Sequence, residues 1–289
     1  MEVSGMGDLV LAGTAGLITG GGSGIGLAAA RHLVRDGASV TLAGRSSERL
    51  DGAVAELQRD APMGVEVRSV VCDVAREDDV AAAVTAALSI TGTLQHCVAS
   101  AGTGTVAPVV AMPAQEWHRV LDSNLHGAFF TLKHAGAAMV RSGGGAFVGL
   151  SSIAGPLTHP FMSAYCVSKA GLEALVRNGA DELGRANVRV NAVRPSMVAT
   201  ELVAPIEQDP EVLADYLANI PMGRTGTVED VAPLIRFLCG PESSWITGQC
   251  IGVDGGHTLR RGPNVEHWAR ALYGGEAVDG PGAMGPGVP

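Results

Sequence analysis

The feature of this sequence that most constrains its fold is a regular alternation between short apolar segments and longer amphipathic ones, from Ala15 to Val253. Such an alternation is typical of a parallel β-sheet covered by helices on both faces. The expected strands are Ala15–Thr19, Ser39–Ala43, Val65–Val71, Leu94–Ala99, Ala146–Leu150, Val188–Val193 and Cys250–Val253. The expected helices are Gly24–Asp36, Ser47–Asp60, Arg76–Leu88, Pro113–Val140, Ser163–Leu183 and Val228–Leu238. The pattern predicts an α/β fold with a doubly wound, seven-stranded parallel sheet.

The order of these segments shows no linker between domains and no internal repeat, so we expect one domain over residues 1–259. Within it, residues 201–223 form a long insertion between sheet elements, a position where a lid or specificity loop is common. Residues 260–289 form a C-terminal extension, and half of Leu272–Pro289 is Gly or Pro, a composition typical of disorder. Thr227, with Asp230 three residues later, predicts a capping box at the last helix.

The composition excludes several classes of protein. With 46% apolar residues, 17% charged residues and a net charge of −9, the chain has no electrostatic footprint for nucleic acid or an anionic membrane surface. Its five cysteines form no CxxC pair and no cluster with zinc spacing, so we expect neither disulfides nor a metal site. The apolar run Leu9–Thr19 follows acidic Glu2 and Asp8, unlike a signal peptide, and no segment is long enough to cross a bilayer. We therefore expect a cytoplasmic protein with a small-molecule partner.

A glycine-rich loop, residues 19–26 (TGGGSGIG), joins the first expected strand to the first expected helix. Glycines let the backbone approach a pyrophosphate, whose charge the free N–H groups and the dipole of the helix N-terminus can then hold. The alternative is that these glycines form a tight turn that binds no ligand. The position between a strand and a helix favours a dinucleotide site, and with it a Rossmann-like domain. The expected cofactor contacts in this loop are Gly20, Ser23, Gly24, Ile25 and Gly26.

Tyr165 and Lys169 lie one turn apart on an expected helix, so their side chains share one helix face. An ammonium group beside a phenol lowers its pKa from a reference of about 10. A tyrosine in that setting can donate and accept a proton near neutral pH. The alternative is that a tyrosine and a lysine share a helix face by coincidence. This is improbable because the chain has only two lysines and three tyrosines. The pair therefore indicates a site for acid–base catalysis.

Taken together, these motifs resemble those of the short-chain dehydrogenase/reductase family, from about Leu9 to Thr258. The family's T-G-x-x-x-G-x-G loop is present as Thr19, Gly20, Gly24 and Gly26, and its Y-x-x-x-K pair as Tyr165 and Lys169. The resemblance implies that the active-site serine is Ser152, rather than Ser151, and that the fourth catalytic residue is Asn124. It also implies cofactor contacts from Asp73, Val74, Ser100, Ala101, Gly102, Tyr165, Lys169, Pro195, Val198 and Thr200.

The chain departs from the family pattern at two positions. The family's Asn-Asn-Ala-Gly after the fourth strand is here Ala99–Gly102 (ASAG), and Ser100 offers fewer hydrogen bonds than asparagine. The usual Pro-Gly after the sixth strand is Pro195-Ser196, and Ser196 lacks the freedom of glycine at positive φ. Neither change touches the groups that transfer protons, so the expected activity stands.

We expect reversible hydride transfer between NAD(P)(H) and a carbonyl/alcohol pair. Tyr165 would donate a proton to the carbonyl oxygen, and Ser152 would hydrogen-bond the same oxygen. By resemblance, Lys169 holds the nicotinamide ribose and Asn124 supports a water path to that lysine. Two alternatives are reduction of an activated C=C bond, which relatives commonly carry out with a different tyrosine and lysine spacing, and a nucleotide-binding regulatory protein without catalysis.

The end of the second strand favours NADP(H) over NAD(H). An acidic residue about 20 positions past the glycines binds the 2′-hydroxyl of NAD, whereas a nearby arginine suits the 2′-phosphate of NADP. Here that position is Gly44. Arg45 and Ser46 follow it and could donate hydrogen bonds to the 2′-phosphate. The alternative is a solvated Arg45 that pairs with Glu48. Ser23 also argues against the preference, because it occupies a position where NADP-preferring relatives often carry a basic residue.

The insertion and the long fourth helix predict the substrate and the assembly. Residues 201–223 contain five acidic residues and no Lys or Arg, so we expect an apolar substrate that is not strongly anionic. The expected helix Pro113–Val140 carries small and apolar residues around much of its circumference, more than one buried face requires. We therefore expect a homo-oligomer, and the resemblance implies a tetramer.

Overall fold

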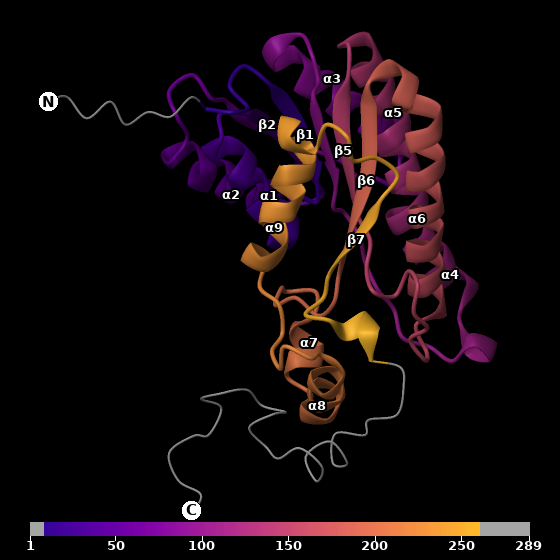
Figure 1. The fold of residues 1–289 in the computed structure, drawn as a ribbon. Coiled ribbons are helices and arrows are strands. Elements are labelled where there is room, and N and C mark those ends of the chain that lie inside the picture. The colour runs from indigo at the N-terminus through magenta and orange to yellow at the C-terminus, as the bar shows by residue number, and fades with distance from the viewer. Residues whose placement is uncertain (1–8, 261–289) are drawn as a thin grey trace, which may run out of the picture. The chain divides into compact units, whose positions relative to one another are not determined.

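The computed structural model describes residues 9–260, and its centre is a seven-stranded parallel sheet (Figure 1). The strand order is β3-β2-β1-β4-β5-β6-β7, with every neighbouring pair parallel. The strands are β1 (Ala15–Thr19), β2 (Ser39–Gly44), β3 (Val67–Val71), β4 (His96–Ala99), β5 (Gly145–Leu150), β6 (Val188–Pro195) and β7 (Cys250–Val253). The predicted doubly wound α/β fold is confirmed. Because the strand order reverses between β1 and β4, their carboxyl ends form the crevice where such folds bind ligands.

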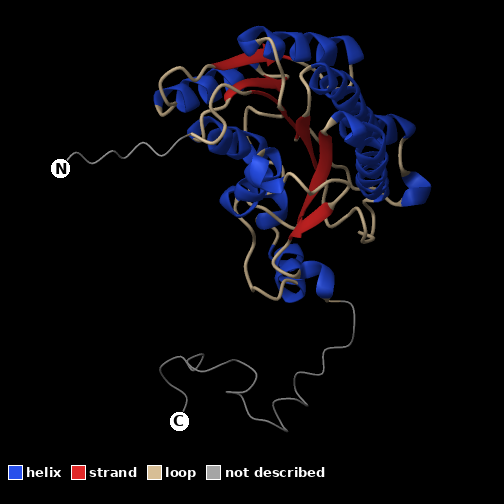
Figure 2. Ribbon diagram, turned by 45° about the horizontal axis from the view of Figure 1, so that its top comes forward, coloured by secondary structure: helices blue, strands red, loops and turns tan. Residues whose placement is uncertain are grey.

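Helices cover both faces of the sheet, as Figures 1 and 2 show. One face carries α1 (Gly24–Arg35), α2 (Ser47–Arg59) and α9 (Val228–Cys239), which share a core with the strands. The other face carries α3 (Glu77–Thr91), α5 (Gly127–Arg141) and α6 (Ser163–Leu183), which share a second core. Both faces are covered, so β1 is buried along its whole length, as its unbroken apolar sequence predicts. The predicted capping box of Thr227 and Asp230 is present at the start of α9.

The long helix predicted over Pro113–Val140 is interrupted. Its parts are α4 (Ala114–Leu121), a π-helical turn η2 (Asp122–His126) and α5. A single π-helical turn widens a helix locally and is frequent at functional sites. Here the turn contains Asn124, whose buried side chain bonds to other elements.

The predicted insertion at residues 201–223 contains two helices that the sequence analysis did not anticipate. They are α7 (Ala204–Glu207) and α8 (Pro210–Asn219), and they lie beyond the ends of β6 and β7 (Figure 1). A local signal for α8 was present, because the Asp209 side chain accepts hydrogen bonds from the backbone of Glu211 and Val212, with proline at the first helical position. Short 3₁₀ turns complete the fold: η1 (Val109–Ala111), η3 (Gly184–Ala186), η4 (Pro241–Ser243) and η5 (His257–Leu259).

Backbone contacts group the described residues up to His257 as one compact unit. The C-terminal extension predicted over residues 260–289 lies outside the described residues, apart from Arg260. Within the described range, the helices are too short or too polar to cross a membrane.

Candidate active site

A pocket of about 580 Å³ opens at the carboxyl ends of β1, β2 and β4, where the strand order reverses. Most of the predicted cofactor residues line it: Gly20, Ser23, Gly24, Ile25, Arg45, Ser46, Asp73, Val74, Ser100, Ala101, Gly102 and Thr200. Gly26, Tyr165, Lys169, Pro195 and Val198 lie outside its lining. The sequence analysis missed two charged lining residues, Arg49 and Glu201. The structure thus brings residues from distant parts of the chain to one edge of the sheet.

The glycine loop has the geometry that its sequence predicts. Gly20 has a φ of +67°, and a Cβ there would lie 2.8 Å from the backbone nitrogen of Ala101. A Cβ at Gly26 would lie 2.4 Å from the carbonyl oxygen of Gly20, so only glycine fits. Ser23 is the N-cap of α1, but its side chain caps no backbone N–H group. The first N–H groups of α1 are therefore available to an anion, such as a pyrophosphate.

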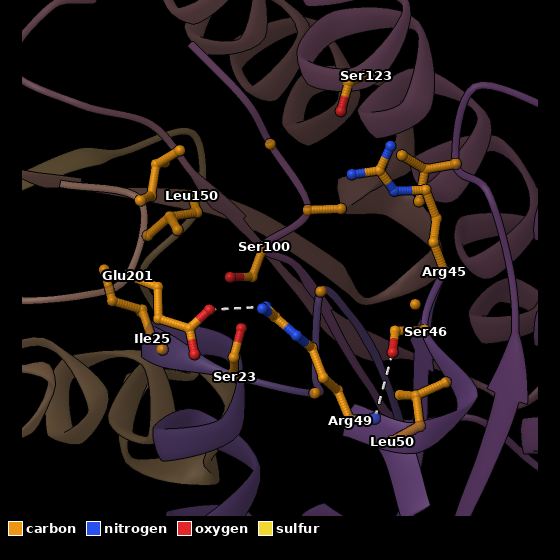
Figure 3. A pocket seen from close by; sticks show the side chains of 18 of the residues that line it. Ser23, Ile25, Arg45, Ser46, Arg49, Leu50, Ser100, Ser123, Leu150 and Glu201 are labelled. Atoms are coloured by element: carbon orange, nitrogen blue, oxygen red, sulfur yellow. Dashed lines mark hydrogen bonds and ion pairs between the residues drawn. The ribbon is translucent and has the colours of Figure 1, made fainter. Parts of the chain in front are cut away.

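The other end of the pocket lies at the tip of β2 (Figure 3). Arg45 is exposed there, and its guanidinium has no ion-pair partner within residues 9–260, so the alternative pairing with Glu48 is absent. The Ser46 hydroxyl accepts a hydrogen bond of 3.3 Å from the backbone nitrogen of Arg49, which caps α2. The Arg49 side chain forms an ion pair of 2.7 Å with Glu201.

Tyr165 and Lys169 occupy one face of α6, as predicted; Lys169 is buried and Tyr165 is partly buried. Nζ of Lys169 lies 5.6 Å from the centroid of the Tyr165 ring and donates a hydrogen bond of 2.6 Å to the carbonyl oxygen of Leu150. Burial lowers the pKa of Lys169 to about 8. Burial also raises the pKa of Tyr165, and this outweighs side-chain hydrogen bonding with Ser152, which lowers it. The predicted direction for the tyrosine pKa was therefore wrong in the free protein, because burial exceeds the effect of the tyrosine's neighbours.

The two adjacent serines at the end of β5 have different partners. The hydroxyl of Ser151 is buried and donates a hydrogen bond of 2.8 Å to Oε1 of Glu173. Glu173 in turn accepts hydrogen bonds of 2.8 and 2.7 Å from the guanidinium of Arg194. Ser152 is the serine whose hydroxyl influences the phenol of Tyr165. Because Glu173 engages the hydroxyl of Ser151, Ser152 stays the predicted active-site serine.

Asn124 connects three segments of the site. Its Oδ1 accepts a hydrogen bond of 2.8 Å from the backbone nitrogen of Thr103, and its Nδ2 donates to the carbonyl oxygen of Thr103 at 2.9 Å. Nδ2 also donates to the hydroxyl of Ser168 at 3.0 Å. A Cβ at Gly102 would lie 3.2 Å from Oδ1 of Asn124 and 3.7 Å from Nζ of Lys169. Asn124 therefore holds the loop after β4 against α6, the helix that carries Tyr165 and Lys169.

Strand β6 ends at Pro195, and the residues that follow leave the sheet without backbone strain at Ser196. Among the non-glycine residues of the described range, only Phe161 and Asn187 have positive φ, so serine fits this position. The Ser196 hydroxyl lies 2.8 Å from Nδ1 of His257, and this imidazole packs edge-on against the ring of Tyr216 in α8, 5.7 Å between centroids. The serine that replaces the usual glycine therefore connects the end of β6 to α8 through His257. Val198 is buried and pairs in a β-bridge with Gly226.

The described residues contain no group of three or more His, Cys, Asp or Glu side chains that could hold a metal ion. The glycine cradle, the uncapped start of α1 and the size of the pocket all fit a dinucleotide. Lys169 lies beside that pocket, because Leu150 both lines the pocket and accepts the hydrogen bond from Lys169.

Comparison with known proteins agrees with this arrangement. A family model described as Enoyl-(Acyl carrier protein) reductase matches residues 20–258. A tropinone reductase homolog from Arabidopsis thaliana is 35% identical over 250 residues, which cover 86% of this chain and 94% of that protein. A 2-(S)-hydroxypropyl-CoM dehydrogenase from Xanthobacter autotrophicus is 37% identical over 249 residues, 83% of this chain and 95% of that protein. The solved structure of a short-chain type dehydrogenase/reductase from Mycobacterium ulcerans is 42% identical, with a TM-score of 0.85 over 93% of this chain and 98% of that chain. This chain belongs to the short-chain dehydrogenase/reductase family of oxidoreductases.

Proposed function

We propose that this protein transfers hydride between NADP(H) and an apolar ketone or aldehyde and the corresponding alcohol. The observation that carries the proposal is the position of Tyr165, Lys169 and Ser152 beside a pocket built to hold a dinucleotide. A bound nicotinamide cofactor would supply the hydride, and the chain supplies position and a proton. Gly20, Gly24 and the start of α1 would hold the pyrophosphate.

In the direction of reduction, Tyr165 donates its phenolic proton to the carbonyl oxygen of the substrate. Ser152 donates a hydrogen bond to the same oxygen and stabilises the negative charge that develops there. Lys169 is fixed by its bond to the Leu150 carbonyl oxygen, which directs the ammonium toward the face of the Tyr165 ring. Asn124 keeps the loop after β4 in place, so that Gly102 leaves room for the lysine.

A second enzymatic reading is reduction of an activated C=C bond, the chemistry that the name of the matching family model describes. The spacing of Tyr165 and Lys169 on one face of α6 favours the carbonyl, because relatives that reduce C=C bonds commonly have a different tyrosine and lysine spacing. Two of the relatives are named as a tropinone reductase homolog and a 2-(S)-hydroxypropyl-CoM dehydrogenase, and these names support the same choice. A regulatory protein that only binds a nucleotide would not need the four polar residues predicted for catalysis, which are Asn124, Ser152, Tyr165 and Lys169.

The preference for NADP(H) rests on the tip of β2. Arg45 lines the pocket there without an ion-pair partner among the described residues, and the preceding Gly44 carries no carboxylate to repel a phosphate. A guanidinium binds a phosphate in bidentate fashion. Ser46 lies beside it, although its hydroxyl already caps α2.

The loops around the site favour an apolar substrate without strong negative charge. The loop after β4 and the loop before α6 are joined by a hydrogen bond of 2.8 Å from the backbone nitrogen of Ala107 to the carbonyl oxygen of Phe161. Both loops expose large apolar side chains, namely Val106, Val109, Val110 and Phe161. The less exposed side of α8 adds Leu213, Tyr216 and Leu217, and buried Ile220 follows the helix. Because residues 201–223 bear five carboxylates and no cation, an anionic acyl carrier would be repelled at this lid.

We also propose that the protein is a cytoplasmic homotetramer. Phe129 and Val140 on α5 are 46% and 42% exposed, and Val167 on α6 is 46% exposed, so apolar surface remains on the two helices that would meet a partner. All five cysteines are free, which suits a reducing compartment. Light scattering tests the assembly, and a monomeric mass would contradict it.

The experiment that tests the activity is a nicotinamide absorbance assay over ketones, aldehydes and alcohols, with both cofactors. Cyclohexenone is the diagnostic substrate, because it contains both bond types. Formation of the allylic alcohol supports carbonyl reduction, and formation of the saturated ketone supports C=C reduction. Cofactor binding without turnover of any substrate in the panel would support the non-catalytic alternative.

A further inference from the structure

An ion pair joins the two sides of the cofactor pocket (Figure 3). Arg49 comes from the first turn of α2, and Glu201 comes from the segment after β6; both line the pocket. The stem of Arg49 lies beside the glycine loop, because a Cβ at Gly22 would be 3.5 Å from the Cβ of Arg49. Thr200, the neighbour of Glu201, approaches the same loop, since its Cγ2 would lie 3.3 Å from a Cβ at Gly24.

Arg49 is also close to the end of the pocket where Arg45 lies. The backbone nitrogen of Arg49 donates to the hydroxyl of Ser46, the residue next to Arg45, so the two arginine side chains leave from either side of Ser46. In Figure 3 their guanidinium groups point apart, Arg49 toward Glu201 and Arg45 toward the side that carries Ser123. The pocket lining therefore holds two arginines on either side of Ser46: Arg45 at the tip of β2, where the adenosine ribose is expected, and Arg49, whose guanidinium is directed toward Glu201.

The ion pair between Arg49 and Glu201 is weak enough to be exchanged. Their side chains are 59% and 69% exposed, and an exposed pair contributes at most about 1 kcal/mol. A phosphate monoester carries nearly two negative charges and offers a guanidinium two acceptors, so it is a stronger partner than one exposed carboxylate.

We propose that Arg49 is a second arginine that binds the adenosine 2′-phosphate, and that Glu201 competes with this phosphate for it. The inference rests on the proposed binding of NADP(H) and extends it to two residues that the family motifs do not include. Glu201 holds Arg49 over the glycine loop while the phosphate is absent. When the phosphate binds, Arg49 exchanges Glu201 for it and acts together with Arg45.

The test measures dissociation constants for two pairs of ligands that differ in the 2′-phosphate, NADPH with NADH and 2′,5′-ADP with 5′-AMP. Arg49→Ala should weaken NADPH and 2′,5′-ADP about tenfold and leave NADH and 5′-AMP within about twofold, as expected for one charge-assisted contact. Glu201→Gln should tighten the two phosphorylated ligands by about threefold, because their competitor is removed. In the Arg49→Ala background, Glu201→Gln should have no effect, because the two residues act through one interaction.

Arg59→Ala is the matched control, because Arg59 is an exposed arginine at the other end of α2 and lies outside the pocket lining. It removes the same charge, and the ratio of NADPH to NADH affinity should stay unchanged. Thermal unfolding of each free variant should match the wild type, which separates binding from folding.

Two results would overturn the inference. In the first, Arg49→Ala weakens phosphorylated and unphosphorylated ligands equally, which would place Arg49 on the pyrophosphate or on the lid. In the second, Glu201→Gln weakens NADPH, which would make Glu201 a support for Arg49 and not its competitor. Failure of the proposed function itself is distinct, because it appears in the wild-type protein as absence of binding of both dinucleotides.

Discussion

Ser151 donates a hydrogen bond of 2.8 Å to Oε1 of Glu173, and this bond gives two adjacent serines separate roles. The Ser151 hydroxyl is buried and belongs to a network that includes Arg194. The hydroxyl of Ser152 is the one that interacts with Tyr165, and it also accepts a hydrogen bond of 3.2 Å from the backbone nitrogen of Ala154. The partners of the two hydroxyls agree with the family resemblance, which implies Ser152.

The first prediction separates these serines by mutation. Ser152→Ala should lower kcat by about 100-fold or more, the usual effect of removing one donor to the reacting oxygen, with little change in stability. Ser151→Ala should lower the free energy of unfolding by about 1–2 kcal/mol, because it removes a hydrogen bond to a charged group, and should keep turnover within a few-fold. Steady-state kinetics and urea unfolding measure both effects. Equal losses of kcat in the two variants would contradict the assignment.

The second prediction concerns Glu173. Its carboxylate is buried and neutralises the guanidinium of Arg194 through two hydrogen bonds. Glu173→Ala would leave that cation without its partner in a largely buried position, so the free energy of unfolding should fall by about 3 kcal/mol or more. Glu48→Ala, at an exposed position of α2, is the control and should change stability by less than about 0.5 kcal/mol. A loss below about 1 kcal/mol in Glu173→Ala would contradict this role.

The third prediction compares two glycines in helices. A Cβ at Gly26 would lie 2.4 Å from the backbone of Gly20, so Gly26→Ala should displace the loop and weaken dinucleotide binding at least about tenfold. A Cβ at Gly52 would meet nothing within 4 Å, so Gly52→Ala should stabilise α2 by about 0.5–1 kcal/mol and leave binding unchanged. Calorimetric titration and thermal unfolding measure the two effects. Unchanged binding in Gly26→Ala would show that the loop does not hold the cofactor.

The fourth prediction is a pH dependence of stability. His96 is buried on β4, and the Thr14 hydroxyl beside it donates to the Leu11 carbonyl oxygen, so Nε2 of His96 is the donor to Thr14 at 2.9 Å. Burial and the positive charge of Arg189 lower the pKa of His96 from 6.5 to about 4. The unfolded chain therefore binds a proton that the folded chain does not between these two pH values.

It follows that the contribution of neutral His96 is fully present above pH 6.5 and is lost as the pH falls toward about 4. The size of this loss should be roughly 3 kcal/mol in the free energy of unfolding. Urea unfolding at several pH values between these limits measures it. His96→Gln keeps a hydrogen-bond donor near Thr14 without a titrating group, and its stability should depend less steeply on pH. An equal slope in wild type and variant would show that other groups cause the acid sensitivity.

The sheet and the glycine loop could be predicted because their causes are local in the sequence. Strands buried on both faces are continuous apolar runs, and the loop needs glycine where a Cβ would meet the backbone of Gly20 or Ala101. The π-helical turn could not be predicted, because the partners of Asn124 are Thr103 and Ser168, 21 and 44 residues away. For the same reason, nothing in the sequence paired Arg49 with Glu201.

The pKa of Tyr165 shows a second limit of prediction from the sequence. The spacing of Tyr165 and Lys169 correctly predicts that they share a face of α6, but it contains no information about their burial. Burial moves both groups toward their neutral forms, which raises the pKa of Tyr165 and lowers the pKa of Lys169. The helix α8 has a local cause, because Asp209 and Pro210 form a capping signal at its start, whereas α7 has no side-chain cap.

The central claim is that Tyr165 transfers the proton in a carbonyl reduction, and Tyr165→Phe tests it most directly because it removes only the phenolic oxygen. The measurement is kcat on the best ketone or aldehyde of the panel, together with the dissociation constant of NADPH, in wild type and variant. We expect kcat to fall by about 1,000-fold, as for the loss of a general acid, while NADPH binds within about twofold of wild type. Turnover that survives the substitution at a rate near that of wild type, with NADPH still bound, would contradict the mechanism.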